Sequence, residues 1–165
     1  MIVTEPPSSG AADTLFAELR KPDLRRFLLR AQKAVGLDGE VTVLLCGDTR
    51  IRELNRDFRG KNKATDVLSF PAGENAEGAA GDLAISLQTA AKQAARHGHS
   101  LAEETRVLLL HGVLHLAGLD HETDAGEMRA REAELRTTLK LPNGLIERTL
   151  APRRRRAAVN AEPAQ

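Results

Sequence analysis

Three of the chain's five histidines lie within HGVLHLAGLDH, residues 111–121. His111 and His115 are one helical turn apart, so their rings share a helix face, and Gly118 can turn the chain back and bring His121 to the same point. Three imidazoles are a typical ligand set for a catalytic zinc ion, which keeps a fourth position for water. We therefore predict that this histidine cluster (His111, His115 and His121) binds a metal. Imidazole ligation favours zinc, with nickel, iron and copper left open.

The acid that usually accompanies this spacing is missing. In the extended zincin pattern of metallopeptidases, His-Glu-x-x-His-x-x-Gly-x-x-His, a glutamate follows the first histidine and acts as the base; here that position is Gly112. A metallopeptidase or other metal hydrolase would need a base from elsewhere, such as Asp120, Glu122 or Asp124. Two of these acids have structural alternatives, since Asp120 could orient a ligand histidine and Asp124 could cap the next helix.

A basic segment, NRDFRGKNKATDVLSFP (55–71), precedes the histidine motif and contains Arg59, Lys61 and Lys63. Such a cluster of cations is often only a solvated surface. Beside a metal centre, however, an arginine can bind a phosphate through two hydrogen bonds, and lysines add less directional attraction. Metal-activated water and an arginine are a workable combination for phosphodiester cleavage, which favours a phosphate substrate over a peptide.

Several segments have the composition of β-strands. EVTVLLC (40–46) is apolar and β-branched between two glycines, which predicts a strand buried on both faces. Segments 65–71 and 82–86 predict two further strands, paired as a hairpin across a glycine-rich loop. The opening MIVT (1–4) predicts one short strand.

Helix caps and apolar periodicity predict the helices that position the site. Ser100 and Glu103 form a capping-box pattern at the start of the helix that carries His111, while Asp48 and Asp124 are expected to cap two other helices. His97 and His99, between two helices, are expected to be exposed and are not counted as ligands. The predicted helices cover residues 22–37, 49–59, 87–98, 101–118 and 125–141.

Length and composition restrict the class of protein. The 165 residues suffice for one domain with a core but not for two, and the absence of Trp and Tyr argues against base stacking on aromatic platforms. Cys46 is the single cysteine, so it is expected to be a buried apolar side chain in a reducing cytoplasm. The N-terminal segment lacks a secretory signal and no apolar run could span a bilayer, which disfavours export and membrane insertion.

Taken in order, NRDFRGKNKATDVLSFP, GDLAIS and HGVLHLAGLDH resemble the YbeY family of bacterial endoribonucleases and rRNA maturation factors, with the clearest match over 41–139. The resemblance implies an α/β (α+β) fold, with one compact domain over 1–150. In it, a small mixed sheet of about four strands packs with about five helices around a zincin-like three-histidine site. Residues 151–165, which include RRRR, are expected to form a basic, disordered tail.

The resemblance also assigns roles to residues. One zinc ion is expected at the histidine cluster, and the arginine that the family needs for activity falls on Arg59. Lys61 and Lys63 fall on basic positions that are expected to bind substrate phosphates. Asp82 in GDLAIS matches the family pattern, with a structural role at a strand end as the alternative.

The expected function is that of a cytoplasmic, zinc-dependent, single-strand-specific endoribonuclease that matures the 3′ end of 16S rRNA and serves ribosome quality control. Its expected partner is RNA of the small ribosomal subunit. Whether a small-subunit ribosomal protein and an assembly GTPase take part stays open, as do the oligomeric state and the general base. Besides a metallopeptidase-like hydrolase, the alternative is a non-catalytic, zinc-stabilised ribosome-assembly factor that binds RNA through its basic surface.

Overall fold

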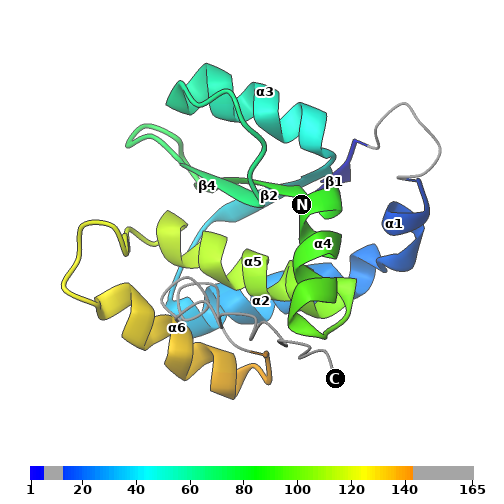
Figure 1. Cartoon of the computed structure of the whole chain (residues 1–165). Helices are drawn as coiled ribbons and strands as arrows, with labels where there is room; N and C mark the ends of the chain where they lie inside the picture. Colours follow the sequence, from blue (N-terminus) through cyan, green and yellow to red (C-terminus); the bar gives the residue numbers. More distant parts are fainter. Residues whose placement is uncertain (6–12, 143–165) are drawn as a thin grey trace, which may run out of the picture.

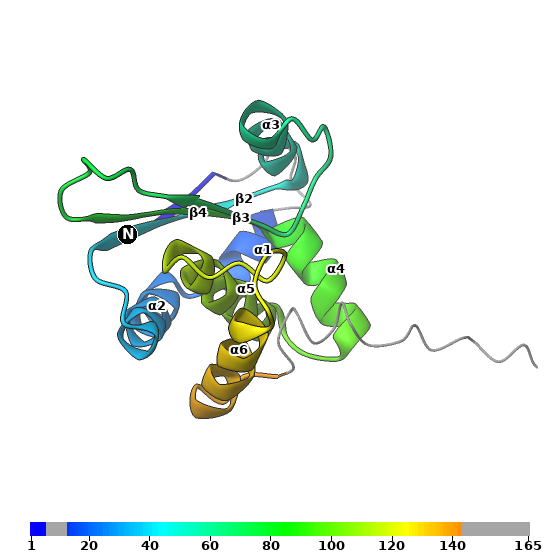
Figure 2. The same cartoon turned by 90° about the vertical axis from the view of Figure 1, so that its left-hand side faces the viewer.

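A four-stranded sheet separates two unequal layers of helices in the computed structural model, which describes residues 1–5 and 13–142. The strands are β1 (Ile2–Thr4), β2 (Glu40–Cys46), β3 (Val67–Pro71) and β4 (Ala79–Ser86). The helices are α1 (Asp13–Glu18), α2 (Lys21–Val35), α3 (Asp48–Arg59), α4 (Leu87–His97), α5 (Leu101–Leu116) and α6 (Glu127–Thr138). Helix α3 alone covers one face, here called the outer face, and the other described helices lie on the opposite, inner face (Figures 1 and 2).

The sheet is mixed, and its order among the described strands is β1-β2-β4-β3. Strand β2 runs parallel to both β1 and β4, whereas β3 runs antiparallel to β4. The predicted mixed sheet and the predicted hairpin of 65–71 with 82–86 are therefore confirmed. Strand β3 has β4 as its single neighbour in this order, so β3 forms one edge of the sheet.

Helix α5 lies in the core and carries the first two histidines of the motif. Every residue from Val107 to Leu114 is buried, because the sheet covers one side of α5 while α2, α4 and α6 pack on the others. The predicted capping box is confirmed: Ser100 Oγ accepts from the Glu103 amide, and the Glu103 carboxylate accepts from the Ser100 amide. This cap fixes where α5 begins and hence which face presents His111 and His115.

The start of α3 differs from the prediction. Gly47 occupies the N-cap position and Asp48 is the first helical residue, without a capping hydrogen bond. The Asp48 carboxylate instead accepts hydrogen bonds from the hydroxyls of Ser86 and Thr89 and from Lys92. Asp48 therefore joins the start of α3 to the junction of β4 and α4 rather than capping its own helix.

Two other details depart from the sequence prediction. The described structure contains a sixth helix, α1, which is one short segment without buried residues and so lacks the periodic apolar face that would predict it. Strand β2 is only partly buried on its outer face, where Cys46 is buried but the two preceding outer-face residues are not. Thr42 and Leu44, on the outer face, are half-buried beside a cavity of about 360 Å³ under α3.

No helix in residues 1–5 and 13–142 is both long and apolar enough to cross a membrane. The predicted tail over 151–165 lies outside the described residues.

Candidate metal centre

The three histidines of the motif converge at the C-terminal end of α5. His111 and His115 extend from successive turns, and Gly118, in the left-handed conformation with φ of 90°, turns the chain so that His121 returns to them. One ring nitrogen from each residue lies within 4.8 Å of the others, and His111 Nε2 is 3.2 Å from His115 Nε2. The predicted convergence of the histidine cluster is confirmed.

The surroundings of His115 favour its neutral imidazole. Burial, together with repulsion from the neighbouring rings of His111 and His121, lowers the pKa of His115 to about 4. At neutral pH the His115 ring is therefore uncharged and has a free lone pair. Three converging imidazoles suit a divalent cation that accepts nitrogen ligands, so the residues fit a zinc ion.

A buried carboxylate forms a hydrogen bond with the first histidine on the side of its ring away from the cluster. Glu132 Oε1, on α6, lies 3.0 Å from His111 Nδ1, and the two side chains are 2 % and 6 % exposed. With Nδ1 engaged by the carboxylate, His111 presents Nε2 to the centre, which is the arrangement by which carboxylates orient metal-binding histidines. Glu132 is not among the site residues predicted from the sequence. Its one signal is that it is an acid on the buried face of α6, between Met128 and Leu135.

Gly112 explains why the zincin glutamate is absent. A Cβ built on Gly112 would lie 2.7 Å from Leu83 Cδ2, which is closer than real contacts allow. The position therefore faces β4 at a point where α5 packs tightly on the sheet, and a glutamate there would clash with the core. The helix position that carries the base in zincins is a packing position in this chain.

The histidine cluster opens into a cavity of about 380 Å³ that also receives Arg59. Arg59 is the last residue of α3, and its exposed side chain reaches this cavity from the outer layer past the edge strand β3. Lys61 and Lys63 are exposed in the following loop and do not line the cavity. The structure thus brings Arg59, but neither lysine, to the cavity that the histidines line.

The three acids near His121 lie in different surroundings. Asp120 and Glu122 line the cavity, but the Asp120 carboxylate accepts hydrogen bonds from the Glu122 amide and the Thr123 hydroxyl. The Asp124 carboxylate accepts hydrogen bonds from the amides of residues 126 and 128, but Gly126 occupies the N-cap position of α6. Asp124 therefore joins the preceding turn to the start of this helix instead of being its N-cap as predicted. Asp120 makes no hydrogen bond to a histidine of the cluster, so the suggestion that it orients a ligand ring is not supported; Glu132 does so instead.

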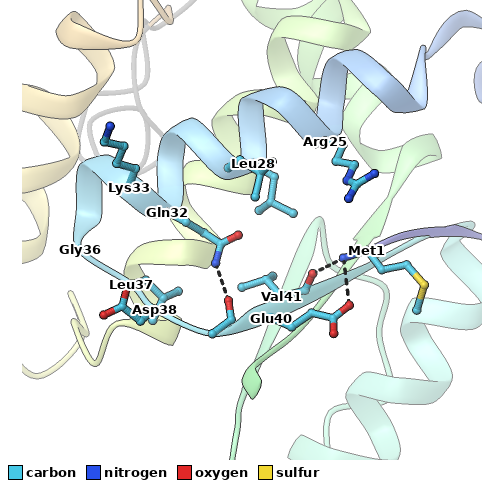
Figure 3. A pocket seen from close by; sticks show the side chains of 12 residues that line it. Met1, Arg25, Leu28, Gln32, Lys33, Gly36, Leu37, Asp38, Glu40 and Val41 are labelled. Carbon is cyan, nitrogen blue, oxygen red and sulfur yellow. Dashed lines mark hydrogen bonds and ion pairs between the residues drawn. The ribbon is translucent and has the colours of Figure 1, made fainter. Parts of the chain in front are cut away.

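A larger cavity, of about 500 Å³, lies away from the histidine cluster between α2 and the start of β2. Figure 3 shows Arg25, Gln32 and Lys33 of α2 on one side of it, with the Met1 amine bonded to Val41 and close to the Glu40 carboxylate on the other. Neither histidine nor cysteine lines this cavity. It therefore offers no comparable set of metal ligands.

The fold and the site are together those of a metal-dependent hydrolase: an α/β domain that gathers three imidazoles, a carboxylate bonded to one of them and an arginine around one cavity. The sequence model of the Endoribonuclease YbeY family matches residues 16–140, and the chain belongs to this family. The matched region begins earlier than the resemblance over 41–139 suggested and takes in α2.

Individual relatives agree with this assignment. The chain is 56 % identical over 141 residues to Endoribonuclease YbeY of Koribacter versatilis, covering 86 % of this chain and 91 % of the relative. It is 52 % identical to Endoribonuclease YbeY of Solibacter usitatus, covering 80 % and 88 %. Among solved structures, TM1509 from Thermotoga maritima matches with a TM-score of 0.53 and 28 % identity, covering 84 % of this chain and 89 % of that one.

Proposed function

We propose that this protein is a zinc-dependent, single-strand-specific endoribonuclease that acts in maturation of the 16S rRNA 3′ end and in ribosome quality control. The observation that carries the proposal is that Arg59 lines the same cavity as the histidine cluster, in a chain of the Endoribonuclease YbeY family. A cation-binding group and a phosphate-binding group on one cavity are what phosphodiester cleavage requires.

His111, His115 and His121 would hold the zinc ion, and Glu132 would keep the His111 ring in the required orientation. A zinc ion bound there supplies Lewis acidity to water and to the substrate phosphate. Burial of His115 keeps its imidazole neutral, so this residue is ready to bind a cation without first losing a proton.

Arg59 would bind the scissile phosphate. Its guanidinium presents a planar set of donors that can contact two phosphate oxygens and stabilise the charge that develops during cleavage. Its exposed position at the end of α3 leaves the side chain open to a polymer that passes over the cavity. Lys61 and Lys63, outside the cavity, would contact phosphates further along the RNA through less directional attraction.

Proton transfer would fall to Glu122. Of the three acids near His121, Asp124 is bonded to amides at the start of α6 and the Asp120 carboxylate is bonded within its turn, whereas Glu122 lines the cavity and is exposed. A carboxylate at the rim of the cavity can accept the proton of an attacking water or deliver one to the leaving oxygen.

The test is cleavage of single-stranded RNA by the zinc-loaded wild type and by Arg59→Ala, His115→Ala and Arg56→Ala. Arg56 is a matched control because it lies on the same helix, pairs with Asp57 and does not line the cavity. We expect Arg59→Ala to lower kcat/KM about 100-fold or more while leaving zinc content unchanged, and Arg56→Ala to stay close to the wild type. Equal residual cleavage by all four proteins would point to a contaminating nuclease and reject the proposal.

The same variants test the non-catalytic alternative. An assembly factor that uses zinc only for structure predicts that Arg59→Ala weakens RNA binding and that the wild type itself cleaves nothing. The nuclease predicts lost cleavage with binding partly retained, because Arg59 is one of several cations near the RNA. The proposal includes a cytoplasmic location, 16S rRNA as the substrate, and the participation of a small-subunit ribosomal protein and an assembly GTPase. Co-purification of the protein with small ribosomal subunits tests these points.

A further inference from the structure

Strand β3 lines the cavity that contains the histidine cluster. Its free edge, the edge that faces away from β4, pairs with no other strand in the described part of the chain. Val67, Ser69 and Pro71 are the lining residues from β3, and they alternate with Leu68 and Phe70, which belong to the cluster on the outer face. The inner-facing residues of the edge strand therefore form one wall of the candidate site.

The register of the hairpin defines which backbone groups this edge presents. The Ser86 amide donates to the Asp66 carbonyl and the Ala72 amide to the Ala80 carbonyl, so even-numbered residues of β3 exchange hydrogen bonds with β4. In an antiparallel pair the intervening residues direct their amide and carbonyl groups away from the partner. The backbone groups of Val67 and Ser69 consequently point toward the open side.

This edge is rich in acceptors and poor in donors. The Val67 amide donates to the Asp66 carboxylate at 2.8 Å, and Pro71 has no amide hydrogen. Within β3, the Ser69 amide is the donor that remains, whereas the carbonyls of Val67, Ser69 and Pro71 are acceptors. An extended peptide needs alternating donors and acceptors to add a strand, so it could satisfy only part of its own backbone here.

We propose that the free edge of β3 binds the unpaired bases next to the scissile phosphate; this inference rests on the proposed nuclease function. Base edges carry amino donors, which the carbonyls of Val67 and Ser69 can accept, and ring or carbonyl acceptors for the Ser69 amide. Phosphates carry only acceptors, so they are repelled by the carbonyls of this wall and are drawn to Arg59.

The proposal gives a physical reason for selecting single strands. In a duplex the Watson–Crick edges of the bases are already paired and cannot reach a protein backbone, whereas an unpaired strand can turn its bases outward. The β3 edge would thus position the strand by its bases and Arg59 by its phosphate, on two sides of one cavity. Recognition through backbone groups also accounts for a cavity without aromatic platforms, because the chain has no Trp or Tyr and none of its four Phe lines this cavity.

The test replaces Ser69 in two ways and measures KM and kcat for a single-stranded RNA oligonucleotide. Ser69→Pro removes the outward amide, and an edge strand tolerates proline at a position whose amide the sheet does not use. Ser69→Ala removes the hydroxyl and keeps the amide, so it is the matched control. We expect Ser69→Pro to raise KM about 3- to 10-fold with kcat and zinc content little changed, and Ser69→Ala, which keeps the amide, to raise KM by less than Ser69→Pro.

A second substrate identifies what the edge recognises. With an oligonucleotide that is abasic on both sides of the cleavage site, Ser69→Pro and wild type should have the same KM. An equal rise in KM on intact and abasic substrates would overturn the proposal, as would an effect of Ser69→Ala as large as that of Ser69→Pro. Unchanged KM in both variants would reject the β3 edge while leaving the nuclease function intact; a wild type that cleaves no RNA would reject the nuclease function itself.

A measurement on the wild type covers the case in which Ser69→Pro does not fold. The Ser69 amide resonance of the zinc-loaded protein should shift, and its hydrogen exchange should slow, when single-stranded RNA is added, but not when duplex RNA is added. Cleavage products remain single-stranded and do not change this expectation. An amide that responds to an extended peptide and not to RNA would overturn the proposal.

Discussion

Replacing Glu132 by glutamine or alanine separates the charge of this side chain from its packing. The carboxylate is 2 % exposed and lies 3.0 Å from His111 Nδ1, so it both orients the ring and makes it a stronger ligand. Loss of such a partner typically weakens metal binding 10- to 100-fold, which corresponds to about 1.4–2.7 kcal/mol. We expect Glu132→Gln near the lower value, since the amide can still accept a hydrogen bond from the ring, and Glu132→Ala near the upper value.

The assay is competition for zinc between the protein and a chromophoric chelator, with thermal unfolding of the metal-free proteins measured in parallel. Glu134→Gln is the control because Glu134 lies on the same helix, is 64 % exposed and pairs with Arg131 on the surface, where an ion pair contributes little. A folded Glu132→Ala protein that binds zinc as tightly as the wild type would refute the role given to Glu132.

Three further outcomes follow from the packing and titration of single residues. Gly112→Glu should strongly lower the midpoint of thermal unfolding and create no peptidase activity, because the new side chain would enter the core at Leu83. A stable variant that cleaves peptides would contradict this prediction. Burial, with the nearby acids Glu5 and Asp48, raises the pKa of the Cys46 thiol to about 12. A thiol reagent at pH 8 should therefore label Cys46 only after unfolding, and rapid labelling of the native protein would contradict this prediction. Burial alone would raise the pKa of Asp48, but its hydrogen bonds, chiefly from Ser86, hold that pKa below the ordinary value. The stability that Asp48 contributes should therefore be present at neutral pH and disappear as the pH falls below about 4, so urea midpoints of wild type and Asp48→Asn should converge in acid; a constant difference would contradict this.

The sequence was sufficient for features encoded within one segment. The spacing of His111, His115 and His121, with Gly118 between them, predicts their convergence because one helical turn and one left-handed turn determine it. The capping box at Ser100, the mixed sheet and the hairpin follow from equally local patterns or from the family resemblance.

Features that depend on contacts between distant segments could not be predicted in this way. Glu132 reaches His111 only because α6 packs on α5, and Gly112 faces Leu83 only because α5 packs closely on β4. His99 was predicted to be exposed, but its side chain is 8 % exposed and contacts the buried Glu104. In each case the partner is set by packing, which periodicity within one element does not reveal.

Zinc titration of RNA cleavage tests the central claim most directly. The metal-free full-length protein is supplied with increasing zinc, and cleavage of single-stranded RNA is measured together with zinc bound per chain. We predict that cleavage is absent without zinc, rises in proportion to bound zinc and reaches its maximum at one ion per chain, and that His115→Ala gains neither zinc nor activity. Full cleavage by the metal-free protein, or by His115→Ala, would contradict the assignment of the histidine cluster as the metal centre of a nuclease.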